Sequence, residues 1–202
     1  MENQKEIAGL ILSAGFSERM GKFKPLIKLN GREFINIVIK KLSKVCTKII
    51  IVIGYKHEHL IDSVNEKFSA DADKDIRNKI FFVKNENPTD GMFSSLKLGV
   101  SQLQNYSWIL YHFVDQPQIP EVFYYEFVKQ TDDNFNWIQP VYGEKKGHPV
   151  LFDKNVVHEI MESENGTLKN ISNDGQIDKK FWNCKFKETL KDFDRPEDLE
   201  RL

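Results

Sequence analysis

The amino-acid sequence predicts an α/β fold, a three-layer α/β/α arrangement in which helices cover both faces of a mostly parallel sheet. Short apolar runs alternate with longer segments of helical periodicity, as in successive βαβ units. A glycine-containing loop directly follows the first apolar run, where parallel sheets bind ligands. Of the 202 residues, 40% are hydrophobic and 29% charged, a composition typical of folded domains. Because no repeat or linker interrupts the chain, we expect one domain over residues 1–202.

The first half of the chain alternates strands and helices. Its predicted elements are a strand over 7–12, a helix over 33–45, a strand over 48–53, a helix over 57–68, a polar surface loop over 69–78 and a strand over 79–83. In the first helix, one face is apolar and consists of Phe34, Ile35, Val38, Ile39 and Leu42. The β-branched run at 48–53 indicates a central strand buried on both sides.

The second half continues the pattern until it becomes less regular. Its predicted elements are a helix over 92–103, a strand over 108–114, a helix over 121–130 and strands over 137–141 and 149–152. The turn at 143–147 favours an antiparallel hairpin between the last two strands. Within the strand over 108–114, we expect His112 to be a core histidine whose ring is hydrogen-bonded.

Charge and cysteine content exclude several classes of protein. The 29 basic and 30 acidic side chains give a net charge of −1, which argues against a generic nucleic-acid binder. Cys46 and Cys184 lack the spacing of a zinc site, and a reducing compartment suits them. The sequence shows neither a signal-peptide pattern nor an apolar stretch long enough to span a membrane. We therefore expect a cytoplasmic protein without nucleic-acid or membrane partners.

The loop after the first strand is suited to an anionic ligand. Ser13, Ala14 and Gly15 are small, and Arg19 and Lys24 follow them. Residues 18–28 carry four basic side chains against one acidic, whereas residues 188–202 carry six acidic against three basic. A Walker A loop is excluded, because five residues instead of four separate Gly15 from Gly21 and because Phe23 stands where that loop needs Ser or Thr. Exposed backbone N–H groups with nearby cations favour a polyphosphate, although an ordinary βα turn with solvated lysines is the alternative.

Five motifs stand in order along the chain. They are Leu12-Ser13-Ala14-Gly15-x-Ser17-x-Arg19-Met20-Gly21-x-x-Lys24-x-Leu26, Gly91-Met92-x-Ser94-Ser95-Leu96-Lys97-x-Gly99, Asp115-Gln116-Pro117, Gly147-His148-Pro149-Val150 and Asp192-Phe193-Asp194-x-Pro196-Glu197-Asp198-Leu199. Together they resemble the MobA-like nucleoside-triphosphate transferases, in particular the branch containing molybdenum cofactor cytidylyltransferase. The resemblance covers almost the whole chain and implies the Rossmann-like fold of nucleotidyltransferases.

The resemblance implies a Mg²⁺-dependent nucleotidyl transfer, in which CMP passes from CTP to a molybdopterin-type cofactor and pyrophosphate leaves. The implied catalytic residues are Arg19, Lys24 and Asp115. The implied nucleotide-binding residues are Ser13, Ala14, Gly15, Arg19, Lys24, Gly91, Ser94 and Ser95. A molybdoenzyme or its maturation chaperone is a further partner that the resemblance suggests.

Carboxylates at two places are the implied metal ligands. Asp115 ends a predicted central strand, where it can hold Mg²⁺ against phosphate oxygens. Asp194 is implied as the second ligand, with Asp192 as the alternative. Each of these aspartates can instead cap a helix or begin a turn.

The acceptor side of the site is implied at Gly147, His148 and Pro149, where the flanking residues predict a constrained, exposed turn. The sequence departs from the family at three places: Lys97 replaces an Arg, Arg195 replaces a Thr, and residues 165–169 lack an acidic residue. A donor such as GTP, or an acceptor such as a sugar phosphate, therefore stays open. So does a nucleotide-binding accessory or oxidoreductase relative that transfers nothing.

Overall fold

The computed structural model describes residues 6–17, 20–164, 166–173 and 175–200. The strands of its main sheet are β1 (Ile7–Ser13), β4 (Lys48–Ile53), β5 (Ile80–Lys84), β6 (Trp108–Phe113), β7 (Trp137–Tyr142), β8 (Lys145–Lys146), β9 (Val150–Asp153) and β10 (Lys179–Asn183). They lie in the order β10-β7-β9-β6-β1-β4-β5, with β8 paired to β7. A separate small hairpin joins β2 (Lys28–Leu29) to β3 (Arg32–Glu33).

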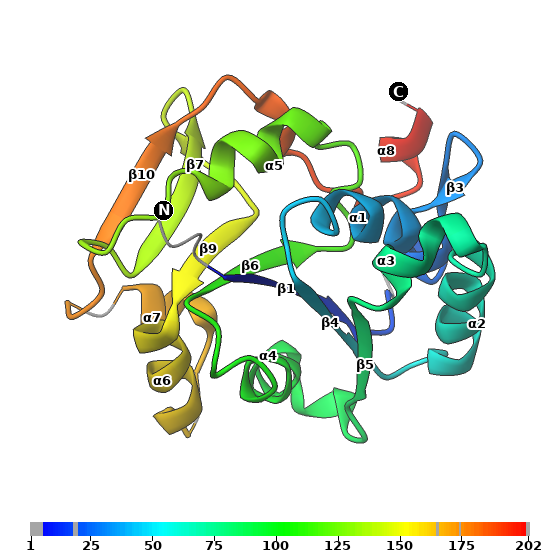
Figure 1. The fold of residues 1–202 in the computed structure, drawn as a ribbon, viewed down its shortest axis with the longest axis horizontal. Helices are drawn as coiled ribbons and strands as arrows, with labels where there is room; N and C mark the ends of the chain where they lie inside the picture. The colour runs from blue at the N-terminus through cyan, green and yellow to red at the C-terminus, as the bar shows by residue number, and fades with distance from the viewer. Residues whose placement is uncertain (1–5, 18–19, 165, 174, 201–202) are drawn as a thin grey trace.

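Helices lie on both faces of the sheet (Figure 1). The α-helices are α1 (Phe34–Leu42), α2 (His57–Lys67), α3 (Lys74–Arg77), α4 (Met92–Ser101), α5 (Glu121–Val128), α6 (Lys154–Glu162), α7 (Leu168–Ser172) and α8 (Glu197–Glu200). The short 3-10 helices are η2 (Lys24–Leu26), η3 (Asp71–Asp73), η4 (Pro88–Asp90) and η5 (Lys187–Leu190). Helices α1, α2 and α5 share one hydrophobic core with the sheet, and α4, α6 and α7 share a second core on its other face. The predicted α/β/α layers are thus confirmed.

The sheet is parallel around β1 and mixed beyond β6. Strand β1 pairs in parallel with β4 and β6, and β4 pairs in parallel with β5. Strand β9 runs antiparallel to both β6 and β7, which confirms the predicted hairpin, and β10 pairs in parallel with β7. Since the chain reaches β4 on one side of β1 and β6 on the other, the carboxyl ends of these strands form the topological switch point at which open α/β sheets bind ligands.

Two sequence expectations differ from the structure. The stretch 69–78, expected to be a loop, contains η3 and α3. The last third is more regular than expected, because it contains α6, α7 and the edge strand β10. Strand β10 was not predicted because it has no apolar run: it begins with Lys179 and Lys180, and its residues are half-buried or exposed. Among the described residues, no helix is both long and apolar enough to cross a membrane.

The loop after β1 packs closely on the end of β4. The Tyr55 N–H donates to the Ala14 carbonyl at 3.2 Å, and Gly54 lies directly against Ala14. A Cβ atom on Gly54 would lie 2.9 Å from the Ala14 carbonyl oxygen, which is a backbone atom and cannot turn aside. A Cβ atom on Gly15, by contrast, would meet nothing within 4 Å. The position of the loop therefore depends on a glycine at residue 54.

We expect Gly54→Ala to lower the free energy of unfolding by about 1–3 kcal/mol, because the added methyl group overpacks the contact between β4 and the loop. Gly15→Ala is the matched control and should change stability by less than about 0.5 kcal/mol. Urea unfolding of both variants and of the wild type measures the difference. Equal stabilities would show that the loop can move away from β4 without cost.

Candidate active site

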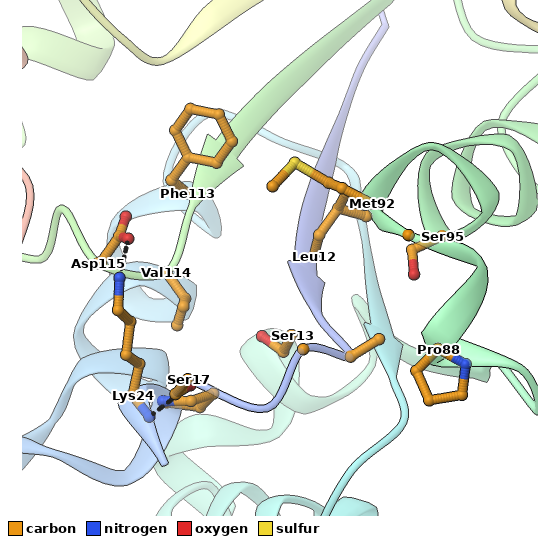
Figure 2. Close-up of a pocket in the computed structure, with 14 residues that line it drawn as sticks. Leu12, Ser13, Ser17, Lys24, Pro88, Met92, Ser95, Phe113, Val114 and Asp115 are labelled. Atoms are coloured by element: carbon orange, nitrogen blue, oxygen red, sulfur yellow. Dashed lines mark hydrogen bonds and ion pairs between the residues drawn. The ribbon is translucent and has the colours of Figure 1, made fainter. Parts of the chain in front are cut away.

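A cavity of about 330 Å³ opens at the switch point, between the loop after β1, the start of α4 and the end of β6 (Figure 2). Its lining includes seven residues that the sequence implicates: Ser13, Ala14, Gly15, Lys24, Gly91, Ser95 and Asp115. The remaining lining residues are Leu12, Ser17, Pro25, Pro88, Met92, Phe113 and Val114. Most of the wall is therefore apolar, with a few polar groups at one end, as in small-molecule sites.

The loop after β1 is held in shape by its own hydrogen bonds. Ser17 has a φ of 57°, and its hydroxyl accepts a hydrogen bond from the Lys24 backbone N–H at 3.1 Å. The Met20 N–H donates to the Ser17 carbonyl at 3.1 Å. The Ser13 side chain is buried, and its hydroxyl has no partner among the described residues. Since Ser13 lines the cavity, this hydroxyl is a ready hydrogen-bond partner for a ligand.

Lys24 joins two carboxylates from distant parts of the chain. Its Nζ lies 2.8 Å from Asp115 Oδ2 and also contacts Asp194 Oδ1. Burial opposes the charge of Lys24, but the hydrogen bonds to Asp115 and Asp194 outweigh burial and raise the pKa of the ammonium group. The lysine is thus cationic at neutral pH. Lys24 and Asp115 lie at the polar end of the cavity, and Asp194 joins them there through its contact with Lys24.

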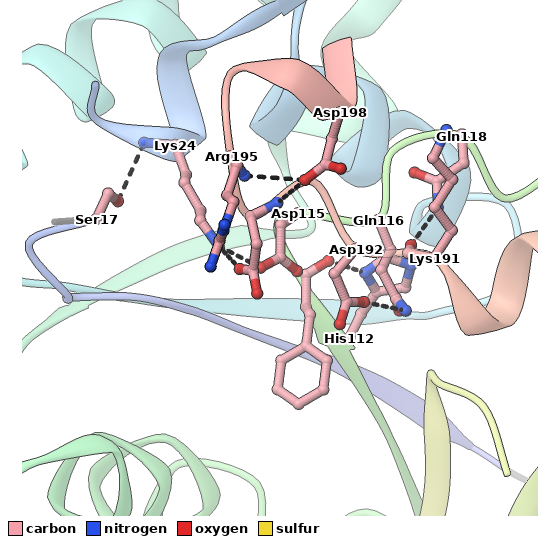
Figure 3. Close-up of polar contacts among 12 residues, drawn as sticks. Ser17, Lys24, His112, Asp115, Gln116, Gln118, Lys191, Asp192, Arg195 and Asp198 are labelled. Atoms are coloured by element: carbon pink, nitrogen blue, oxygen red, sulfur yellow. Dashed lines mark hydrogen bonds and ion pairs between the residues drawn. The ribbon is translucent and has the colours of Figure 1, made fainter. Parts of the chain in front are cut away.

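The C-terminal segment is fixed against the loop that follows β6 (Figure 3). The Phe193 N–H donates to the Asp115 carbonyl at 3.0 Å, and the Phe193 ring packs on Phe34 of α1. Gln116 Nε2 donates to Asp192 Oδ1 at 2.7 Å. Gln118 Nε2 donates to the carbonyls of residues 188 and 191. These contacts bring Asp194 beside Asp115 although they are far apart in sequence.

The two C-terminal aspartates have different surroundings. Asp194 contacts Lys24, whereas Asp192 turns toward Gln116. Burial, followed by the negative charge of Asp115, raises the pKa of Asp192. Asp198 Oδ2 accepts hydrogen bonds from the backbone N–H groups of residues 194 and 195, just before α8. The geometry thus favours Asp194 as the partner of Asp115.

Asp115 and Asp194 fit a divalent metal ion. The Asp115 Oδ1 atom is buried and has no hydrogen-bond partner among the described residues, although Oδ2 is paired with Lys24. A hard cation binds carboxylate oxygens of this kind and takes its other ligands from phosphates and water. No group of three or more His, Cys, Asp or Glu side chains suited to a metal occurs in the described part of the chain. A metal held here would take Asp115 and Asp194 as ligands from the described part of the chain.

The start of α4 forms the opposite wall. Gly91 precedes the helix with a φ of 90°, which favours glycine. Asn85 Nδ2 donates to the hydroxyls of Ser94 and Ser95 at 3.0 and 2.9 Å. Ser94 in turn donates to the Gly91 carbonyl and lies outside the cavity lining, so of the two predicted serines only Ser95 faces the cavity. Asn85 was not expected, although a polar residue just after a strand is a detectable signal.

The segment expected at the acceptor side is not the exposed turn that was predicted. Gly147 and Pro149 are buried, and His148 is half-buried with its ring 4.6 Å from that of Phe113. Burial lowers the pKa of His148 to about 4, so its imidazole is neutral at pH 7. Thr189 packs against this segment: its carbonyl accepts a hydrogen bond from the His148 N–H at 2.9 Å, and its side chain lies directly against Gly147. Through Phe113, His148 adjoins the cavity without being part of its lining.

Two predicted residues remain, His112 and Arg19. His112 is a hydrogen-bonded core residue as predicted, because its Nε2 lies 2.6 Å from the Tyr124 hydroxyl and its Nδ1 lies 2.6 Å from the Phe113 carbonyl. Arg19 lies outside the described residues.

A second cavity of about 400 Å³ adjoins the first, with which it shares Gly91 and Met92. Its other lining residues are Asp90, Phe93, Leu96, Tyr111, Gly166, Thr167 and Leu168.

Curated relatives of known name cover most of the chain. A probable molybdenum cofactor guanylyltransferase from Bacillus cytotoxicus is 25% identical over 172 residues, which are 83% of this chain and 80% of that protein. The molybdenum cofactor cytidylyltransferase of Escherichia coli is 25% identical over 158 residues, 78% of this chain and 76% of that protein.

Solved structures share the fold over nearly the full length. A nucleotidyl transferase from Methanothermobacter thermautotroptrophicus has a TM-score of 0.76 at 20% identity and covers 97% of this chain and 95% of its own. A Mycobacterium tuberculosis protein, Rv0371C, in complex with manganese has a TM-score of 0.70 at 17% identity, covering 98% and 97%. The family described as the MobA-like NTP transferase domain matches residues 9–177. The chain therefore belongs to the MobA-like NTP transferase family.

Proposed function

We propose that this protein is a Mg²⁺-dependent nucleotidyltransferase that transfers CMP from CTP to a molybdopterin-type cofactor and releases pyrophosphate. The observation that carries the proposal is the convergence of Lys24, Asp115 and Asp194 at the end of the cavity. An ammonium group and two carboxylates at one point match a metal–triphosphate complex, in which negative and positive charges alternate. Family membership and the names of the relatives support the same reaction class.

The nucleoside would lie along the apolar wall and its triphosphate would point toward Lys24. Ser13, Ala14 and Gly15 offer small side chains, which let backbone N–H groups approach phosphate oxygens. Ser95 and Gly91 would contact the nucleoside from the α4 side. The flexible stem of Lys24 allows its ammonium group to turn from the carboxylates to a phosphate oxygen. Arg19 is proposed as a second cation on the strength of its motif.

In the transfer, an acceptor phosphate oxygen forms a bond to the α-phosphorus while the bond from that phosphorus to the bridging oxygen breaks. The electron pair leaves with pyrophosphate. Asp115 and Asp194 would hold Mg²⁺, which would neutralise negative charge at the reacting phosphate. Lys24 would stabilise the negative charge that develops on pyrophosphate, and the cavity walls would keep the reacting groups in line.

The second cavity is a candidate for the acceptor. It meets the first cavity at Met92, and the side chains of Phe93, Leu96, Tyr111 and Leu168 give it apolar and aromatic walls. Such walls suit a flat heteroaromatic ring, and the Asp90 carboxylate at one side can accept hydrogen bonds from ring N–H groups. Gly147, His148 and Pro149 would complete the acceptor side through the contact of His148 with Phe113. A neutral His148 would bind by hydrogen bonding, and not as a cation.

GTP is the second candidate donor, because a relative named as a guanylyltransferase is as similar in sequence as the cytidylyltransferase. The departures at Lys97, Arg195 and residues 165–169 bear on the acceptor, because two of them adjoin its proposed cavity: residues 166–168 line it, and Lys97 Nζ donates to the Ser163 carbonyl nearby. A molybdoenzyme or its maturation chaperone in the cytoplasm would receive the product.

The first experiment measures pyrophosphate release by the purified protein with Mg²⁺, molybdopterin-type cofactor and each of the four nucleoside triphosphates in turn. We expect release with CTP well above release with the other three. Release with GTP alone would show that GTP is the donor in the same type of reaction. No release with any donor would contradict transfer to this acceptor.

Asp115→Asn should lower kcat by about 100-fold or more, because it removes charge from the proposed metal site while keeping the side chain's shape. Circular dichroism and thermal unfolding should show an intact fold. Asp71→Asn, at an exposed position, is the matched control and should leave kcat unchanged. Near-normal turnover of Asp115→Asn would remove Asp115 from the metal site.

Lys24→Ala should weaken CTP binding roughly 10- to 100-fold but CMP binding by much less, because only the triphosphate reaches the ammonium group. Calorimetric titration of both nucleotides measures the two dissociation constants. Lys22→Ala, an exposed lysine of the same loop, is the control and should affect neither. Equal losses for CTP and CMP would contradict the proposed role of Lys24.

A further inference from the structure

We propose that Lys41 is a positioning residue for nucleotidyl transfer: its buried ammonium group holds the loop that carries Asp115 against α1, and so keeps Asp115 in register with Lys24. This inference rests on the proposed function, because positioning is defined by the reaction. Lys41 belongs to none of the five sequence motifs. The residue lies in α1, outside the cavity lining.

The hydrogen bonds of Lys41 end on one short loop. Its Nζ donates to the Pro117 carbonyl at 2.5 Å and to the Ile119 carbonyl at 2.6 Å. Pro117 and Ile119 are themselves buried. A half-buried lysine whose hydrogen bonds go to backbone carbonyls costs desolvation energy that a carboxylate partner would otherwise offset. The helix retains this charge at a position where an apolar side chain would pack without that cost.

The loop has few ways to hold itself. Residues 117 and 120 are prolines and lack backbone N–H groups, so side chains must supply much of the hydrogen bonding. Gln116 and Gln118 tie the loop to the C-terminal segment on one side. Lys41 ties it to α1 on the other side. The loop is therefore clamped between two elements, and Asp115 lies at its beginning.

The α1 end of the clamp is also the support of Lys24. The 3-10 helix that begins with Lys24, η2, packs against α1, and its Leu26 joins the same hydrophobic core as α1. The Phe34 N–H at the start of α1 donates to the Ile27 carbonyl at 2.8 Å. One helix thus fixes both sides of the contact between Lys24 and Asp115. Loss of the Lys41 clamp would let the Asp115 loop move relative to Lys24.

The charged groups around Lys41 give the clamp a pH limit. Burial lowers the pKa of Lys41 to about 8, against a partial opposing effect of the Glu121 carboxylate on α5. His112 of β6 also interacts electrostatically with Lys41, and its ring is hydrogen-bonded to the Tyr124 hydroxyl of α5. Burial lowers the pKa of His112 to about 3 and raises that of Tyr124, so both stay neutral across this range. Above pH 8, Lys41 loses its proton and the charge-assisted hydrogen bonds weaken.

The experiment compares Lys41→Met and Lys41→Arg with Lys40→Met, an exposed neighbour in the same helix. We expect Lys41→Met to lower kcat at least tenfold at pH 7.5 with less than a threefold change in KM for CTP, and Lys40→Met to change neither. The wild type should lose kcat as the pH rises through 8, and Lys41→Arg should keep it to higher pH because guanidinium stays charged. Thermal unfolding of each variant at pH 7.5 and above pH 8 separates unfolding of the protein from displacement of Asp115.

Two outcomes would overturn the proposal. The first is a kcat of Lys41→Met within threefold of the wild type in a folded protein. The second is an alkaline fall that is the same in Lys41→Arg as in the wild type. Should the wild type transfer no nucleotide at all, the proposed function fails, and hydrogen exchange in residues 113–120 still tests the clamp. Faster exchange in Lys41→Met than in Lys40→Met supports the clamp, and equal exchange overturns it.

Discussion

The contact of Lys24 with Asp115 and Asp194 is the interaction on which the arrangement of the site depends. It joins the first loop, the loop after β6 and the C-terminal segment at one point. Two carboxylates close together repel each other, and the ammonium group between them removes that repulsion. Phe193, Gln116 and Gln118 hold the C-terminal segment at the switch point of the sheet, and Lys24 neutralises the two carboxylates that this arrangement brings together.

Rigid surroundings hold this contact in place. Strand β1 has parallel neighbours on both sides, which fixes its end, and Gly54 lets the following loop lie against β4. Gln116 and Gln118 bind the Asp115 loop to the C-terminal segment through hydrogen bonds. Yet the site keeps buried polar atoms without partners among the described residues, at Ser13 and Asp115. Unsatisfied groups of this kind cost stability, and they are expected where a ligand completes the hydrogen bonding.

The sequence predicts the features that arise from local pattern. Apolar runs predict β1, β4 and β6, and the motifs predict that Lys24, Asp115 and Asp194 come together. Asp194 was predicted from the motif resemblance and not from periodicity, because no local sequence rule places a C-terminal aspartate at the end of β6. Burial of this segment could not be predicted, since it involves two residues distant in sequence: Phe113, which packs on the His148 ring, and Thr189, which lies against Gly147. Lys41 could not be predicted, because its hydrogen bonds to residues 117 and 119 are long-range and leave no mark on the local sequence. Asn85 could have been predicted, because it is a polar residue just after a strand.

The most direct test of the central claim is Mn²⁺ binding, followed by electron paramagnetic resonance, for the wild type, Asp115→Asn and Asp194→Asn with and without CTP. If the two carboxylates and a triphosphate share one metal, Mn²⁺ should bind the wild type much more tightly in the presence of CTP. Each substitution should then weaken that binding by about tenfold or more. Mn²⁺ affinity that does not change with CTP, or that is the same in all three proteins, would contradict the account.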